Sequence, residues 1–364
     1  MSTTSVDQSK QRGMVAIMIT MILMIVISLI VLGFAQISRR NQRQSLDRQL
    51  STQAFYAAET GVNDAAELIN TAIANGLPVA DKPSCSPDPG GFYAGLNPTI
   101  SATDGVAYTC LMVDTTPSSL IYSTVGTTGT VIPVIATSGT IGSIQLTWQS
   151  KGGSATPAAT CPTGTTSVFG TTGSWSCGYG VLRFDLLPSS VAYGITTLRT
   201  STMTAFVVPL RPGSVGTANP VSYAGGGASD LQGVVCSNSS CSLVINFAAP
   251  QSQYYMRITS LYKDVSLQVT AYAAANASGA SLSLQGAQAL IDVTGKARDV
   301  LRRIQVRAPV AGAGTNLLSD YAIQSAESIC KRFSVMDGFS QNDASNALPG
   351  VENTTTNPLC KPYP

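Results

Sequence analysis

The sequence predicts an α+β protein, in which a long amino-terminal transmembrane and amphipathic helix precedes a β-rich, antiparallel, disulfide-containing head. Three observations predict this class. An uncharged apolar run lies close to the amino terminus, and a stripe of small and apolar residues continues from it at helical spacing. The remaining chain is rich in Ser, Thr, Gly and Pro, alternates apolar with polar residues in short runs, and contains eight cysteines.

The apolar run covers residues 14–38, which include no charged residue. As a helix this run is about 37 Å long, enough to cross a hydrocarbon layer of about 30 Å. The apolar core of a secretory signal peptide is shorter and precedes a small-residue cleavage site. We therefore expect the span to be retained, as the membrane anchor of a single-pass protein.

The helix is expected to continue beyond the membrane to residue 76. Apolar and small residues recur there at gaps of three and four, which places them on one helix face. The stripe comprises Leu46, Leu50, Ala54, Ala57, Ala58, Gly61, Val62, Ala65, Leu68 and Ile69. Asn75 and Gly76, followed by Pro78, predict the end of the helix. Residues 14–76 thus form one predicted segment.

The charges next to the span give conflicting evidence on topology. Arg39, Arg40, Arg43 and Arg48 follow the span, and the positive-inside rule places such residues in the cytoplasm. The cysteines and the sparsely charged, Ser/Thr-rich body instead favour an extracellular position. We give more weight to the body, since a long exported domain can override a small charge bias, and we expect a plasma-membrane protein with an extracellular carboxy-terminal head.

Residues 77–310 are expected to form the head, as one β domain or two. Alternating runs of the kind that have one buried face occur at 142–148, 182–186, 243–247, 265–269 and 300–306. Lys296 and four arginines between 298 and 307 lie in and beside the last run; they are expected on a solvated sheet face or on a face that binds an anionic surface. Residues 311–364 are expected to be a loop-rich tail tied down by a disulfide.

The even number of cysteines and the lack of a Cys-x-x-Cys motif favour disulfides over metal or redox chemistry. The candidates are Cys85, Cys110, Cys161, Cys177, Cys236, Cys241, Cys330 and Cys360. Pairing of neighbours, such as Cys236 with Cys241, is our expectation. The alternative is that some of these residues are buried as small hydrophobic side chains.

The composition excludes several functions. The chain has no histidine, which removes His-ligated zinc, serine or cysteine catalysis through a histidine, and imidazole acid–base catalysis. A net charge of +2 and the lack of interleaved aromatic and basic residues give no reason to expect nucleic-acid binding. No nucleophile-elbow, zincin or P-loop motif occurs, so no enzyme activity, cofactor or metal is predicted.

At its amino terminus the sequence resembles the type IV prepilins. These proteins have a short hydrophilic, basic leader that ends in glycine, followed at once by an apolar helix and a globular head. The matching residues are Gln11-Arg12-Gly13 followed by Met14-Val15-Ala16-Ile17-Met18. The segment Gln53–Val62 is especially similar to the PilX-type minor pilins. The resemblance covers about the first seventy residues.

The resemblance implies how the chain is processed and stored. A prepilin peptidase would remove the leader, residues 1–13, by cutting between Gly13 and Met14, and would methylate the new amino group of Met14. Major pilins have a glutamate at the fifth mature position, where this chain has Met18. The chain therefore does not supply the pairing attributed to that acid, which favours a tip or sparsely placed subunit over a major one.

Several residues leave two interpretations open. Ala54, Ala57, Ala58 and Gly61 suit packing against other pilin helices or against the chain's own head. Glu59 suits a contact with a neighbouring subunit or a solvated helix surface. The arginines after the span suit lipid headgroups or a salt bridge to a subunit.

The functional prediction is a minor pilin, a non-enzymatic structural subunit of a type IV pilus or pilin-like filament that acts in assembly, tip priming or surface contact. Its predicted partners are the prepilin peptidase, other pilin subunits and membrane lipids, and after assembly it would lie at the cell surface in the pilus. One alternative is a single-pass, membrane-anchored surface adhesin with an uncleaved signal-anchor. Another is a tethered hydrolase that uses a Ser-Lys pair.

Overall fold

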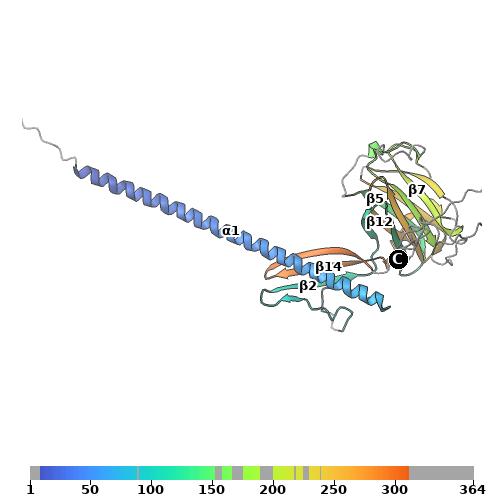
Figure 1. Cartoon of the computed structure of the whole chain (residues 1–364), viewed down its shortest axis with the longest axis horizontal. Coiled ribbons are helices and arrows are strands. Elements are labelled where there is room, and N and C mark those ends of the chain that lie inside the picture. Colours follow the sequence, from blue (N-terminus) through green and yellow to red (C-terminus); the bar gives the residue numbers. More distant parts are fainter. Residues whose placement is uncertain are drawn as a thin grey trace, which may run out of the picture. The chain divides into compact units, whose positions relative to one another are not determined.

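The computed structural model describes residues 9–87, 90–151, 158–165, 175–188, 200–216, 219–223, 229–237 and 239–310. One helix, α1 (Ser9–Ala74), is followed by strands that form three sheets (Figure 1). The predicted fold class, a long apolar helix followed by an antiparallel-rich, disulfide-containing head, is confirmed. The structural expectations for residues 311–364, including Cys330 and Cys360, lie outside the described residues.

Helix α1 is 66 residues long, which corresponds to about 99 Å. It begins five residues before the expected cleavage point and ends where the sequence predicted. Gly76 has a left-handed φ of +67°, the amide of Leu77 donates to the Ala72 carbonyl (2.8 Å), and the amide of Gly76 donates to the Ile73 carbonyl (3.0 Å). This pair of hydrogen bonds around a left-handed glycine is the Schellman motif, which satisfies the last helix carbonyls.

The carboxy-terminal part of α1 packs on a four-stranded antiparallel sheet of order β1-β2-β14-β15 (Figure 1). The strands are β1 (Thr99–Ser101), β2 (Val106–Asp114), β14 (Gln288–Ala297) and β15 (Val300–Pro309). The core between helix and sheet includes Val62, Ala65, Ile69, Val113 and Ile291. We call this part the helix–sheet unit.

A β-sandwich is inserted between β2 and β14, two strands that are neighbours in the sheet. Asp114, the last residue of β2, pairs with Leu290 of β14, so the two ends of the insertion meet. One sandwich sheet has the order β3-β12-β5-β10-β8 and the other β13-β4-β11-β6-β7-β9. The two largest hydrophobic cores of the described residues are thus separate, one inside the sandwich and one between α1 and its sheet. The sequence left open whether the head is one domain or two.

The five strands of the first sandwich sheet are β3 (Leu120–Val125), β5 (Ile141–Ser150), β8 (Val221–Tyr223), β10 (Cys241–Gln251) and β12 (Val265–Tyr272). The six strands of the second are β4 (Thr130–Ala136), β6 (Val181–Pro188), β7 (Met203–Leu210), β9 (Ser229–Val235), β11 (Gln253–Leu261) and β13 (Leu284–Gln285). Short 3-10 turns occupy Ala158–Thr160 and Ala275–Ala277. Pairing is antiparallel except for β10 with β8 and β7 with β9.

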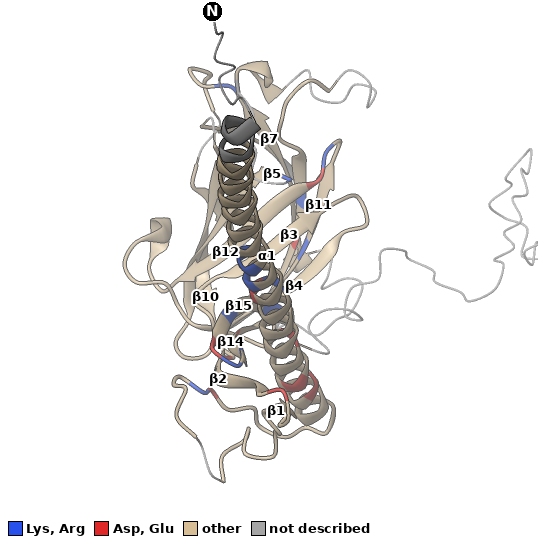
Figure 2. Cartoon of the chain, turned by 90° about the vertical axis from the view of Figure 1, so that its left-hand side faces the viewer, with Lys and Arg blue, Asp and Glu red and all other residues tan. Residues whose placement is uncertain are grey.

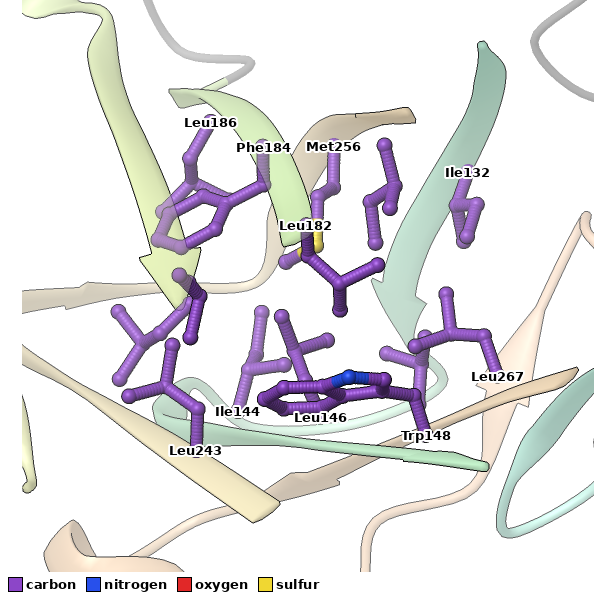
Figure 3. Packing of buried hydrophobic residues seen from close by; sticks show 14 of the residues in the cluster. Ile132, Ile144, Leu146, Trp148, Leu182, Phe184, Leu186, Leu243, Met256 and Leu267 are labelled. Atoms are coloured by element: carbon purple, nitrogen blue, oxygen red, sulfur yellow. The ribbon is translucent and has the colours of Figure 1, made fainter. Parts of the chain in front are cut away.

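The inward side chains of the two sandwich sheets form one buried core (Figure 3). Ile144, Leu146 and Trp148 of β5 face Leu182 and Phe184 of β6, as the alternation of these runs predicts. Four of the five predicted alternating runs lie in strands with a buried face, β5, β6, β10 and β12. The fifth run lies in β15, an edge strand without fully buried residues, because only α1 covers part of it.

Candidate assembly site on the amino-terminal helix

The amino-terminal part of α1 presents mostly apolar and no charged side chains to its surroundings between residues 16 and 38. All side chains described between residues 16 and 38 are exposed, and this is the stretch of α1 long and apolar enough to cross a membrane. Gly13 and Met14 lie in the first turns of the helix. Met18, at the position of the missing acid, is 67% exposed. The structure thus places an unpaired hydrophobic surface where the sequence predicts the span.

Basic residues mark the end of this surface. Arg39, Arg40, Arg43 and Arg48 are exposed and form no ion pair within the described part of the chain. In Figure 2 the basic residues follow the apolar part of α1, and acidic residues appear further toward its carboxy-terminal end. Arg39, Arg40 and Arg43 line a common hollow together with Gln36 and Gln44, so their side chains lie on one side of the helix.

The small-residue stripe is buried against the chain's own sheet. Ala54, Ala57 and Ala58 have almost no exposed surface, and Gly61 is buried. A Cβ on Gly61 would lie 2.8 Å from Cγ1 of Val293 and 2.9 Å from Cγ of Tyr108. Of the two interpretations of the stripe, packing on the head is the one present in this structure.

Gly295 of β14 provides the matching close approach from the sheet. A Cβ at this position would overlap the carbonyl oxygen of Ala54 and the backbone nitrogen of Ala58. Only a residue without a side chain allows the strand to lie this close to the helix backbone. Gly295 was not among the predicted helix-packing residues; an isolated glycine inside a strand is the sequence signal that indicates such a close approach.

The opposite face of the same helix segment is exposed, with no described part of the chain packed over it. Phe55 and Tyr56 are 49% and 60% exposed, and their rings meet edge to face with centroids 5.9 Å apart. Glu59 is also exposed and has no ion pair among the described residues. An aromatic pair beside a carboxylate is therefore available to another protein surface, while the small residues are not.

Polar contacts fix the helix on the sheet. Tyr108 of β2 donates a hydrogen bond to Asp64 of α1 (3.2 Å), and Nε of Arg302 in β15 donates to Oγ of Ser51 (2.8 Å). Burial, the negative charge of Asp64 and this hydrogen bond together raise the pKa of Tyr108 to about 12. The two contacts fix the position of α1 along the sheet on both sides of the small residues Ala54, Ala57, Ala58 and Gly61.

The sheet face away from α1 contains a buried carboxylate, Asp292 of β14. Arg303 of β15 binds it through two nitrogens, with Nε 2.7 Å from Oδ1, and the carboxylate raises the pKa of this guanidinium. Arg307 donates to the Ser119 carbonyl (2.6 Å), and burial lowers its pKa. With Arg302, which donates to Ser51, three of the five basic residues predicted as a group are thus engaged within the chain.

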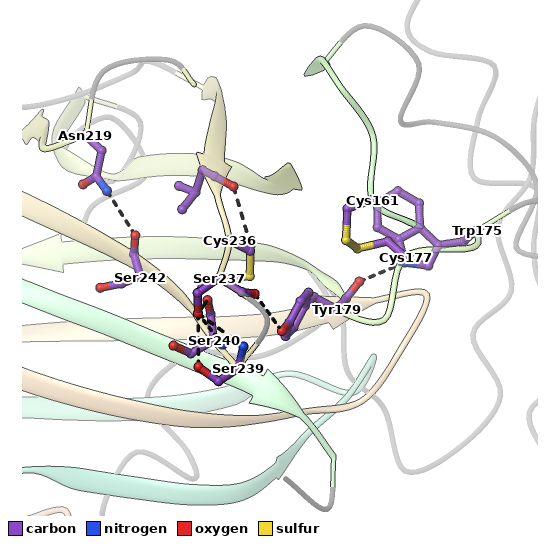
Figure 4. The surroundings of a disulfide bond; sticks show 12 residues. Cys161, Trp175, Cys177, Tyr179, Asn219, Cys236, Ser237, Ser239, Ser240 and Ser242 are labelled. Atoms are coloured by element: carbon purple, nitrogen blue, oxygen red, sulfur yellow. Dashed lines mark hydrogen bonds between the residues drawn. A yellow bond between two sulfur atoms is a disulfide. The ribbon is translucent and has the colours of Figure 1, made fainter. Parts of the chain in front are cut away.

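Three disulfides join cysteines that are close in sequence. Cys85 pairs with Cys110, Cys161 with Cys177, and Cys236 with Cys241. The expected neighbour pair Cys236–Cys241 is confirmed, and no described cysteine is free. Figure 4 shows Trp175 beside Cys161–Cys177, where its indole nitrogen donates to the Tyr179 carbonyl (2.9 Å). The first disulfide ties the segment after α1 to β2, and the other two lie in the sandwich.

Comparison with known families identifies the amino-terminal segment. The PilX N-terminal family matches residues 12–63, which include the expected cleavage junction, the apolar run and the small residues Ala54, Ala57, Ala58 and Gly61. No curated protein and no solved structure gives a match to the chain. The inserted sandwich lies wholly outside the matched region. Residues 12–63 are thus similar to the PilX amino-terminal segment, and the similarity extends over this part of the chain alone.

Proposed function

We propose that the chain is a minor pilin, a non-enzymatic subunit of a type IV pilus or pilin-like filament. The observation that carries the proposal is the PilX N-terminal match over residues 12–63, which includes the apolar run of α1, exposed throughout residues 16–38. In the bilayer this surface contacts lipid, and in a filament it contacts other apolar helices at little net hydrophobic cost. The helix is the assembly element and the head is displayed.

Processing in this proposal follows the resemblance. The prepilin peptidase removes residues 1–13 at the cytoplasmic face, and Met14 becomes the methylated first residue. The mature subunit waits in the plasma membrane with its head outside, and then joins the fibre through α1. Met18 replaces the acid of major pilins, which favours a place at the tip or at few positions along the fibre.

The inserted sandwich supports a role in surface contact or tip priming. It is attached through neighbouring strands of the helix–sheet unit and has its own core, so it adds a second folded body to a pilin-like subunit. The free aromatic pair Phe55–Tyr56 and the nearby Glu59 provide a surface for a neighbouring pilin subunit.

The test is the mass of the amino-terminal peptide after co-expression with a prepilin peptidase. We expect a peptide that begins at methylated Met14 in the parent chain and an intact leader in a Gly13→Leu variant. A parent chain that keeps residue 1, with the peptidase active on a control substrate, would contradict the proposal and favour the adhesin with an uncleaved signal-anchor.

A further inference from the structure

Three of the four arginines after the span lie on the helix face that packs on the sheet. Arg39, Arg40 and Arg43 are each 18 residues before Ala57, Ala58 and Gly61, respectively. Eighteen residues are five full helical turns, so each arginine lies below a residue that is buried against the sheet. The side of α1 that faces the sheet thus becomes strongly basic next to the apolar run.

The β14–β15 turn points along this face toward the membrane-spanning part of α1. Val293 lies against Gly61, Gly295 against Ala54 and Ala58, and Ala297 in a cluster with Ala54. Strand β14 therefore runs toward the amino terminus of α1 as it approaches its turn. Val300, just after the turn, and Leu50 of α1 pack against the same cluster, and Arg302 donates to Ser51. Leu50 is twelve residues or about 18 Å beyond the end of the apolar run.

The turn carries the side chains of a membrane-surface loop. Leu301 is 58% exposed, and its cross-strand neighbour Lys296 is also exposed. Arg298, at the turn itself, has φ +54° and an exposed side chain. An exposed leucine between basic residues suits the interface between lipid headgroups and water.

The charge balance of this corner favours an anionic surface. Its basic residues are Arg39, Arg40, Arg43, Lys296, Arg298 and Arg302, and its acidic residues are Asp47, Asp104 and Asp299. Asp104 already accepts a hydrogen bond from Ser101 (2.9 Å). A net positive charge next to a membrane span attracts anionic phospholipid headgroups.

The length of the apolar run brings the turn within reach. A run of about 37 Å in a hydrocarbon layer of about 30 Å favours a tilt of up to about 35°. With layers packed roughly 10 Å apart, tilting toward the sheet lowers the turn from about 18 Å to about 9 Å above the hydrocarbon. Long basic side chains then reach the headgroups.

We infer that, in the membrane-stored subunit, α1 tilts toward its sheet and the β14–β15 turn docks on anionic phospholipids together with Arg39, Arg40 and Arg43. The docking goes beyond the proposed function, because it requires only that α1 spans the membrane. It is expected whether or not the leader is cleaved. Leaving the membrane for a filament then requires release of this contact.

The test places one tryptophan at a time in the full chain, reconstituted in nanodiscs with brominated lipids that quench indole fluorescence. Leu301→Trp reports whether the β14–β15 turn is docked on the membrane. Leu77→Trp is the matched control, because Leu77 has the same 58% exposure but follows the far end of α1, about 40 Å beyond Leu50. Ile27→Trp reports insertion of the span. The parent chain gives the background of Trp148 and Trp175.

In discs that contain phosphatidylglycerol we expect Leu301→Trp and Ile27→Trp to be quenched and Leu77→Trp not. Replacing Arg39, Arg40 and Arg43 by Gln should lower the docked-to-undocked ratio roughly fivefold for each charge removed. Quenching of Ile27→Trp alone would overturn the docking and leave the anchor intact. Equal quenching of Leu301→Trp in phosphatidylcholine discs would overturn the attraction by charge, and no quenching at residue 27 would overturn the anchor itself.

Discussion

The contact between helix and sheet depends on two glycines, one on each side: Gly295 of β14 and Gly61 of α1. Gly295 lies against the backbone of Ala54 and Ala58, and Gly61 lies against Val293 and Tyr108. Neither contact has room for a methyl group. The closest obstacle at Gly295 is main chain, which cannot change rotamer, whereas at Gly61 it is side chain. Substitution by alanine should therefore be more destabilising at Gly295 than at Gly61.

We predict that Gly295→Ala destabilises the helix–sheet unit by about 3 kcal/mol or more, and Gly61→Ala by about 1–3 kcal/mol, because overpacking forces the layers apart. The measurement is denaturant unfolding of the detergent-solubilised chain, followed by circular dichroism. Gly95→Ala is the control, since no atom lies within 4 Å of its new Cβ. Equal stability of all three variants would contradict the close approach.

Tyr108 makes the same contact sensitive to alkaline pH. Its pKa is raised to about 12 from an ordinary value near 10, so its contribution to stability is complete below pH 10 and is lost as the pH rises toward 12. We predict that the melting temperature of the helix–sheet unit falls between pH 10 and 12, and that Tyr108→Phe reduces this fall. An identical pH dependence in parent and variant would assign the effect to other tyrosines.

At the scale of elements, the disulfides close short loops in both parts of the head. The loops span 25 residues for Cys85–Cys110, 16 for Cys161–Cys177 and 5 for Cys236–Cys241. A disulfide that closes a longer loop removes more conformational entropy from the unfolded chain. The order of their contributions should thus follow loop length.

We predict that removing Cys85–Cys110 by paired Ala substitutions costs about 3–4 kcal/mol in the helix–sheet unit. Removing Cys236–Cys241 should cost about 2 kcal/mol in the sandwich. Differential scanning calorimetry of the two double variants measures both. A shift of the sandwich transition after loss of Cys85–Cys110 would contradict the assignment of that bridge to the helix–sheet unit.

Local signals in the sequence were enough to predict most elements. The three- and four-residue gaps between Leu50 and Ile69 predicted one helix face, Asn75-Gly76 its end, and the alternation in β5, β6, β10 and β12 their buried faces. Each of these signals depends on neighbours within a few residues. The apolar run could likewise be predicted, because its pattern is continuous in sequence. The leader junction between Gly13 and Met14 stays a prediction.

Local signals could not predict that the sandwich is inserted between β2 and β14. They also could not predict which surface covers the small residues of α1. Asp114 and Leu290 pair across 176 residues, and nothing near either one indicates the other. Ala54 and Ala58 suit any surface that allows close approach, so the choice of the chain's own Gly295 depends on that same distant pairing. The aromatic pair Phe55–Tyr56 became a candidate interface only when the sheet was seen on the other side.

At the scale of the whole molecule, the two cores imply two folding units. The helix–sheet core and the sandwich core share no buried residue, and hydrogen bonds join them near the insertion points, as between Gln288 and the backbone of Ile121. The main connection between them is therefore covalent. Each unit contains its own disulfides.

We predict that the sandwich can be removed without unfolding the rest. Replacing residues 117–287 by Asn-Gly joins β2 to β14 through a two-residue hairpin turn, for which this dipeptide is well suited. Hydrogen exchange should still protect the amides of Ala58 and Val293 in the shortened chain. Loss of protection there, with the separate sandwich folded, would show that the sheet needs the insertion.

The place of the insertion also sets an order for folding. Bringing β2 and β14 together across an unfolded stretch of 176 residues costs about 4–5 kcal/mol of loop-closure entropy, but a folded sandwich holds these ends side by side. The sheet therefore closes after the sandwich has formed, and only then does it cover Ala54 and Ala58. Until the sheet closes, the helix surface around Ala54 and Ala58 is exposed. A chain with a misfolded insertion therefore presents a different helix surface from that of the fully folded chain. The exposure of Ala54 and Ala58 on α1 thus depends on whether the inserted sandwich has folded.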